Sequence, residues 1–111
     1  TARWALLTAP SETENLVTEV ARLADRHRES FGFLPDASYE EAAARGRLWI
    51  ATGTSGEVAG YLFFGGRYPN ISVTQLFVHA EHRKTGLGTF LVDALKRHAQ
   101  KTGRQTISAR V

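Results

Sequence analysis

Leu76-Phe77-Val78-His79-Ala80-Glu81-His82-Arg83-Lys84-Thr85-Gly86-Leu87-Gly88 is the stretch that decides the fold, because it leads from an apolar strand through a basic loop into a helix. The glycines at 86 and 88 allow positive φ and let a ligand approach the backbone closely. Successive amides of such a loop, and the N-terminus of the helix that follows, favour negative charge at one place. Arg83 and Lys84 add two side-chain cations there. The stretch therefore predicts an anion-binding loop between a strand and a helix.

The segments on either side of this loop predict an antiparallel meander followed by a parallel strand. Strand-like runs at 48–51, 58–64 and 71–78 are separated by turns that are too short for a parallel crossover. Apolar residues at helical spacing from Leu87 onward predict a helix that ends at Gly103. The run 106–109 follows that helix, so it should lie parallel to its predecessor through a right-handed crossover.

The N-terminal part of the chain predicts one short strand and two helices. An apolar run at 4–8 stops before Pro10, which suits a strand closed by a breaker. Two capping boxes, in which a serine hydroxyl and a glutamate carboxylate each pair with a backbone amide, predict the two helix starts: Ser11 with Glu14, and Ser38 with Glu41. The second helix should end at Gly46. The expected fold class is α/β (α+β), with a mixed sheet and the order β-α-α-β-β-β-α-β.

Length and composition exclude several classes of protein. The 111 residues allow one domain, because two cores would each be too small to be stable. The absence of cysteine excludes a disulfide framework and a thiolate metal site, and we expect a cytoplasmic protein. No apolar run approaches the roughly 20 residues of a membrane span, so no membrane partner is expected.

Charge is distributed unevenly along the chain. Residues 1–60 carry six basic and nine acidic side chains, whereas residues 61–111 carry eight basic and two acidic ones. Such an asymmetry indicates that the second half meets something anionic. Nucleic acid, a phosphorylated cofactor and an acidic protein are the candidates.

Two familiar phosphate-binding loops do not match this sequence. A Walker loop needs Gly-Lys-Ser/Thr, and a dinucleotide fingerprint needs a third glycine where Leu91 stands. Instead, Arg83-x-x-Gly86-x-Gly88 resembles the Q/R-x-x-G-x-G/A pyrophosphate loop of the GNAT superfamily of N-acetyltransferases. The preceding Leu-Phe-Val-His, the helix that follows and the order of the elements resemble that family as well, over residues 3–111.

The resemblance implies a GNAT-like fold that binds acetyl-CoA as a substrate, with a bulge in the strand before the loop. Backbone groups of Leu76, Phe77 and Val78 would pair with the pantetheine arm. The pyrophosphate would be held by the loop residues Arg83, Lys84, Thr85, Gly86, Leu87 and Gly88. No metal is implied, and without cysteine or a nearby carboxylate pair the histidines at 79 and 82 are expected to be ordinary loop residues.

The implied reaction is attack of a neutral primary amine, on a small molecule or a protein, on the thioester of acetyl-CoA. Some members of the family place a glutamate base where this chain has Ser72, Thr74 and Gln75, none of which titrates near neutral pH. The acid that protonates the thiolate is often a tyrosine on a later helix, past residue 111. The sequence therefore assigns no catalytic residue.

Two other functions stay open beside N-acetyl transfer. A CoA-binding or protein-interaction module without turnover would agree with the missing acid-bearing helix. Nucleic-acid binding ranks last, because the basic residues are not interleaved with exposed aromatics. Phe31 and Phe33 are candidates for lining the acceptor pocket and equally for the core, whereas Tyr39 and Tyr68 are expected in the core or in turns.

Compared with the family, the chain is shorter by one helix and two strands, so we expect a single domain that is incomplete at its C-terminus. An uncovered sheet edge favours pairing with another chain. We therefore expect the edge near residues 104–111 to be covered by a second copy, as a homodimer, or by a different chain.

Overall fold

A computed structural model describes residues 4–26, 35–67, 69–103 and 106–109 and contains a five-stranded mixed sheet in the order β1-β2-β3-β4-β5. The strands are β1 (Ala5–Leu7), β2 (Leu48–Thr52), β3 (Val58–Gly65), β4 (Asn70–Val78) and β5 (Thr106–Ala109). The first four pair antiparallel with their neighbours, and β5 lies parallel to β4. The predicted meander and the predicted parallel last strand are both confirmed.

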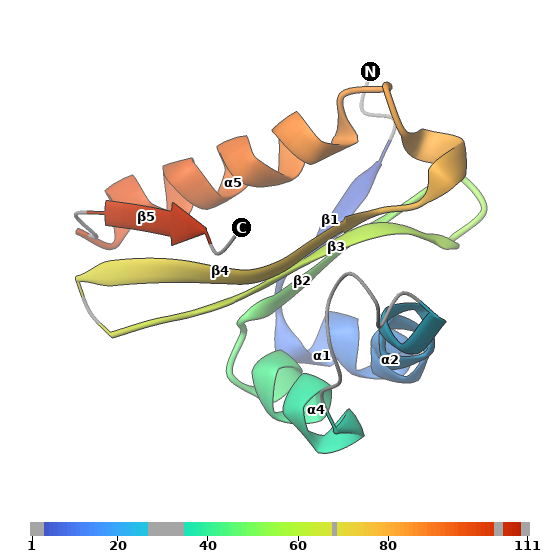
Figure 1. Ribbon diagram of the computed structural model, residues 1–111, viewed down its shortest axis with the longest axis horizontal. Helices are drawn as coiled ribbons and strands as arrows, with labels where there is room; N and C mark the ends of the chain where they lie inside the picture. Colours follow the sequence, from blue (N-terminus) through green and yellow to red (C-terminus); the bar gives the residue numbers. More distant parts are fainter. Residues whose placement is uncertain (1–3, 27–34, 68, 104–105, 110–111) are drawn as a thin grey trace.

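Helices cover both faces of this sheet (Figure 1). One face carries α5 (Leu87–Lys101), and the opposite face carries α1 (Pro10–Thr13), α2 (Val17–Arg26) and α4 (Asp36–Ala44). The described residues also form two 3-10 turns: η1 (Glu14–Leu16) joins α1 to α2, and η2 (Ala80–His82) follows β4. The predicted α/β class is therefore confirmed. Within the described ranges, every helix is too short or too polar to cross a lipid bilayer.

The strand period of two sorts the side chains into two cores. On β3, Tyr61 points into the core beneath α2 and α4, and its neighbour Leu62 points into the core beneath α5. Both side chains are fully buried. Helical spacing places the buried stripe of α5 against the same sheet: Leu87, Leu91, Ala94, Leu95 and Ala99. β3 is buried on both faces along most of its length, and β4, from whose end the loop leaves, pairs with it.

The first helix starts one residue before the predicted capping box. Pro10 is its first residue, because the fixed φ and missing N–H of proline suit that position. The carboxylate of Glu12 accepts hydrogen bonds from the backbone amides of Ala9 at 3.1 Å and Thr8 at 3.3 Å. The prediction that Ser11 and Glu14 form the cap is therefore wrong, and Glu12 takes the glutamate's role.

The helix α4 also starts earlier than predicted. It begins at Asp36, and the carbonyl of Pro35 accepts a hydrogen bond from the Ser38 amide at 2.9 Å. Ser38 therefore lies inside the first turn and is not the cap, while Asp36 places a negative charge at the positive end of the helix dipole. Both predicted helix ends are confirmed, because Gly46 and Gly103 each adopt a φ of +73°.

Candidate functional site

The strand β4 carries a bulge at Thr74. Phe63 of β3 pairs with Gln75 and the next residue, Phe64, pairs with Val73, so Thr74 has no partner on β3. In the described part of the chain β5 follows β4 only from Asn70 to Val73. A bulge bends a strand and increases its twist, so β4 leaves the line of β5 at this point. The chain thus contains the bulge that its resemblance implied.

Beyond the bulge, the last residues of β4 have one paired edge and one open edge among the described residues. Leu76, Phe77 and Val78 pair with Leu62, Tyr61 and Gly60 of β3, and no described strand lies on their other side. In an antiparallel ladder alternate residues direct their N–H and C=O groups away from the partner strand. The Leu76 side chain is 36% exposed, more than any other large apolar side chain in the described ranges. This edge therefore offers backbone hydrogen-bonding groups beside an apolar side chain.

The loop after β4 adopts left-handed backbone at two positions. Lys84 has a φ of +65°, and no other non-glycine residue that the structure describes has a positive φ. Gly86 has a φ of +92°. Left-handed residues within a turn make successive amides converge on a concave surface that binds anions. Gly86 is also the N-cap of α5, whose first amides lack partners within the helix. The left-handed loop residues thus stand directly before the amides that α5 leaves without partners within the helix.

Local hydrogen bonds and packing hold the loop in this shape. The Thr85 hydroxyl donates to the carbonyl of His82, and the Nε of Arg83 donates to the carbonyl of Val78 at 3.4 Å. A Cβ on Gly88 would stand 3.8 Å from Cγ2 of Val78, so the first turn of α5 packs closely on the end of β4. The open edge and the loop are thus neighbouring parts of one rigid surface.

The two loop histidines are engaged in local contacts. Nδ1 of His79 accepts from the Glu81 amide at 3.3 Å. His82 accepts from the Trp4 indole at 3.4 Å and lies 3.9 Å from the Glu57 carboxylate. Among the residues that the structure describes, no three His, Asp or Glu side chains gather in a way that could hold a metal ion.

A buried polar cluster lies directly behind the bulge. Gln75, which is 3% exposed, accepts a hydrogen bond from the Tyr61 hydroxyl at 2.8 Å and donates one to the Tyr39 hydroxyl oxygen at 3.1 Å. Burial raises the pKa of Tyr61 far above its ordinary value, and it raises the pKa of Tyr39 as well. The core prediction for Tyr39 is confirmed. Gln75 faces this cluster and is not a candidate base.

The other residues predicted for the site differ in exposure, and some lie outside the described ranges. Thr74 is exposed and Ser72 is half-buried, so hydroxyl groups stand at and just before the bulge. Phe31 and Phe33, the candidates for the acceptor pocket, lie outside the described residues, as does Tyr68. Arg83 and Lys84 are both exposed on the loop.

Gly60, which was not among the residues predicted for the site, lets the strands around it pack closely. A Cβ at this position would lie 2.5 Å from the Phe77 carbonyl oxygen and 3.2 Å from a methyl carbon of Leu87. Only glycine lets β3 approach both the open-edge strand and the first residue of α5 this closely. The available signal was a glycine inside a strand pattern, which often marks a close backbone approach.

The sequence matches the model of a known protein family. The model of the acetyltransferase (GNAT) family matches residues 14–111, which include the whole of β4, the loop and α5. No curated protein matches the sequence.

Solved structures of similar fold include three that match more than nine tenths of this chain. A ribosomal-protein-alanine N-acetyltransferase from Brucella melitensis biovar Abortus 2308 is 20% identical with a TM-score of 0.71, over 97% of this chain and 78% of that one. The Mycobacterium tuberculosis protein Rv2747, in complex with CoA and NLQ, is 18% identical with a TM-score of 0.77, over 93% and 61%. N-acetylglutamate synthase from Neisseria gonorrhoeae, complexed with coenzyme A and N-acetyl-glutamate, is 14% identical with a TM-score of 0.78, over 98% and 25%. At these identities the likeness shows the fold.

Proposed function

The chain belongs to the acetyltransferase (GNAT) family, and we propose that it binds acetyl-CoA at the bulged end of β4 and transfers the acetyl group to a primary amine. The observation that carries this proposal is the open edge of Leu76–Val78 beside a loop with left-handed backbone at Lys84 and Gly86. Two solved structures of the same fold hold CoA, which supports this choice of donor.

The two halves of the proposed donor site suit the two halves of CoA. The pantetheine arm carries amide groups on a narrow chain, so it can add to the open edge of β4 as a further strand would. Its apolar parts would contact Leu76. The pyrophosphate would bind the amides of residues 83–88 at the N-terminus of α5, with Arg83 and Lys84 adding charge.

The reaction proposed at this edge is a single acyl transfer. The amine nitrogen forms a bond to the thioester carbonyl carbon, the carbon–sulfur bond breaks, the ammonium proton leaves nitrogen, and the thiolate takes up a proton. Binding both partners side by side supplies much of the rate, because it converts a bimolecular step into one within a complex. No described side chain is assigned as the base or the acid.

Calorimetric titration with CoA tests the donor site. We expect binding by the wild-type chain and its loss when Gly86→Glu is combined with Arg83→Glu, because both changes place negative charge where the pyrophosphate would lie. Wild-type protein that does not bind CoA, or a double variant that binds it equally well, would overturn the proposal.

A non-catalytic CoA-binding module is the second candidate. It is favoured by the side chains at the bulge, where Ser72 and Thr74 carry only hydroxyls and Gln75 is held by two tyrosines. Release of free thiol from acetyl-CoA across a panel of amines separates the two functions. Turnover rejects the non-catalytic module, and CoA binding without turnover supports it.

Pairing of a second chain along the edge near residues 104–111 stays a prediction that light scattering checks.

A further inference from the structure

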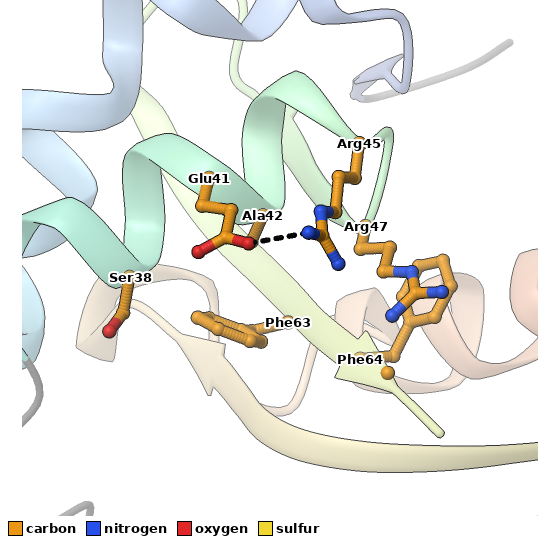
Figure 2. Close-up of a pocket in the computed structure, with 8 residues that line it drawn as sticks. Ser38, Glu41, Ala42, Arg45, Arg47, Phe63 and Phe64 are labelled. Atoms are coloured by element: carbon orange, nitrogen blue, oxygen red, sulfur yellow. Dashed lines mark ion pairs between the residues drawn. The ribbon is translucent and has the colours of Figure 1, made fainter. Parts of the chain in front are cut away.

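A pocket of about 240 Å³ lies on the face of the sheet opposite α5, between α4 and the end of β3 (Figure 2). The helix α4 contributes Ser38 and Glu41, Arg45 follows directly after the helix, and β3 contributes Phe63, Phe64 and Gly65. Arg47, just before β2, also lines the pocket. The pocket thus combines two phenylalanines with two guanidinium groups and one carboxylate.

The charges in this pocket do not cancel. Arg45 forms an ion pair with Glu41 at 2.7 Å, drawn in Figure 2. Arg47 is half-buried, and in the described part of the chain it has no ion-pair partner within 4.0 Å. One unit of positive charge therefore remains, and it is on Arg47. Holding an unpaired cation partly out of water costs free energy, which a bound anion offsets.

The position of Arg47 is set by the backbone on both sides of it. Its amide donates to the Ala42 carbonyl at 2.8 Å, and its carbonyl accepts from the Phe64 amide at 3.0 Å. Its Nη1 stands 3.9 Å from the place where a Cβ on Gly65 would be, so the guanidinium lies beside the end of β3. The backbone that carries the cation is therefore fixed at both of its polar groups.

The pocket lies one strand away from the proposed transfer edge. Its residues on β3 are those that face the bulged part of β4, since Phe63 pairs with Gln75 and Gly65 pairs with Ser72. Neighbouring strands are about 4.8 Å apart. Arg47 stands beside Gly65, which pairs with Ser72, whereas the open edge begins at Leu76, whose partner Leu62 lies three residues from Gly65 along β3. A ligand that joins the two would thus span one to two strand spacings across the sheet, about 5–10 Å, and roughly 10 Å along it.

We propose that this pocket binds a carboxylate carried by the amine acceptor, which makes the acceptor an amino acid-like molecule whose amine and carboxylate are several bonds apart. The inference rests on the proposed function, because it places the amine at the open edge. Arg47 pairs with the carboxylate through its planar fork of N–H donors, and the Phe63 ring contacts the intervening methylene groups. A single net positive charge suits a monoanionic carboxylate better than a phosphate dianion.

The kinetic test compares two acceptors of equal length, 6-aminohexanoate and its neutral amide, 6-aminohexanamide. We expect the wild-type protein to prefer the acid by about tenfold or more in kcat/KM, as for a charge-assisted hydrogen-bonded pair. Arg47→Gln should remove the preference by slowing only the acid, and Arg47→Lys should keep part of it because lysine retains the charge without the fork. Arg97→Gln, the same charge change on the exposed surface of α5, should keep the preference.

An equal effect of Arg47→Gln on both acceptors, or no preference in the wild-type protein, would overturn the proposal. A binding measurement separates it from the proposed function. The product 6-acetamidohexanoate is titrated into wild-type protein and Arg47→Gln, each with CoA present. Binding that needs Arg47 supports the pocket even without turnover, and intact CoA binding without product binding overturns it while leaving the donor site in place.

Discussion

The hydroxyl of Tyr61 donates a hydrogen bond of 2.8 Å to the side-chain carbonyl of Gln75, the residue that follows the bulge at Thr74. Both side chains are almost completely buried, and Tyr39 completes the cluster from α4. The cluster therefore ties the bulged strand to β3 and α4 at the point where β4 leaves the line of β5. Two predictions rest on this contact.

The first concerns alkaline pH. Burial raises the folded-state pKa of Tyr61 above the unfolded value of about 10, so above that pH the unfolded chain binds fewer protons than the folded one. The protonated Tyr61 hydroxyl thus contributes fully to the free energy of unfolding below about pH 10. This contribution is lost as pH rises toward the folded-state pKa. Denaturant unfolding between pH 8 and 11 should show a fall in the free energy of unfolding that is smaller in Tyr61→Phe. Equal pH dependence in both proteins would contradict this.

The second concerns Gln75 itself. In Gln75→Ala the two tyrosine hydroxyls lose their partner inside the core, which should lower the free energy of unfolding by about 1–3 kcal/mol. Thr74→Ala, on the exposed neighbouring residue, should change it by less than about 0.5 kcal/mol. Urea denaturation at neutral pH measures both, and similar losses in the two variants would show that the cluster does not stabilise the bulge.

The two loop glycines should differ in their tolerance of alanine. Gly86 has a φ of +92°, a conformation that costs other residues about 1–2 kcal/mol, so Gly86→Ala should weaken CoA binding by about tenfold. At Gly88 a Cβ would make an ordinary contact of 3.8 Å with Val78, so Gly88→Ala should bind CoA nearly as the wild-type protein does. Calorimetric titration checks this order, and the reverse order would refute the proposed loop geometry.

Gly60 should be far less tolerant of alanine than Gly65 in the same strand. The added methyl at 60 would stand 2.5 Å from the Phe77 carbonyl oxygen, whereas at 65 the nearest atom is 3.9 Å away. We expect Gly60→Ala to lower stability by about 1–3 kcal/mol, as overpacking does, and to weaken CoA binding by shifting the end of β4. Thermal unfolding and CoA titration of the two variants decide the matter, and equal stability would contradict it.

CoA binding should weaken as salt is added, because the loop cations Arg83 and Lys84 are exposed and are screened by ions. Arg83→Gln should bind CoA more weakly at low salt and should show a smaller dependence on salt. Arg97→Gln provides the matched charge change on α5, away from the loop, and should leave both quantities as in the wild-type protein. An identical salt dependence in Arg83→Gln and wild type would remove Arg83 from the donor site.

Much of the fold could be predicted from local pattern. The nearly continuous apolar runs of β2 and β3 reflect burial on both faces of the sheet, and the helical spacing of leucines in α5 reflects burial of one face, so the meander and the crossover followed directly. The starts of α1 and α4 could not be predicted from the serine and glutamate spacing. At each start a proline stands at or just before the first turn, and its fixed φ determines where the helix begins.

The proposed donor loop was also visible in the sequence, because its chemistry is local: the spacing of Arg83, Gly86 and Gly88 predicts a turn with left-handed backbone at a helix start. The proposed acceptor pocket was not visible. Arg47 and Phe63 are 16 positions apart, and nothing in either segment predicts that they line one pocket.

The sequence by itself thus determined the order of the elements and the left-handed loop before α5, since both depend on residues near one another along the chain. Only the tertiary structure decided which polar residues are buried together and which are open to a ligand. Gln75 could have faced the open edge or the core, and the bulge at Thr74 with the tyrosines behind it directs the side chain into the core. The tertiary structure places the Arg47 guanidinium beside Gly65, where no carboxylate of the described residues lies within 4.0 Å of it. Such contacts join distant segments, and their energies depend on burial that local sequence does not specify.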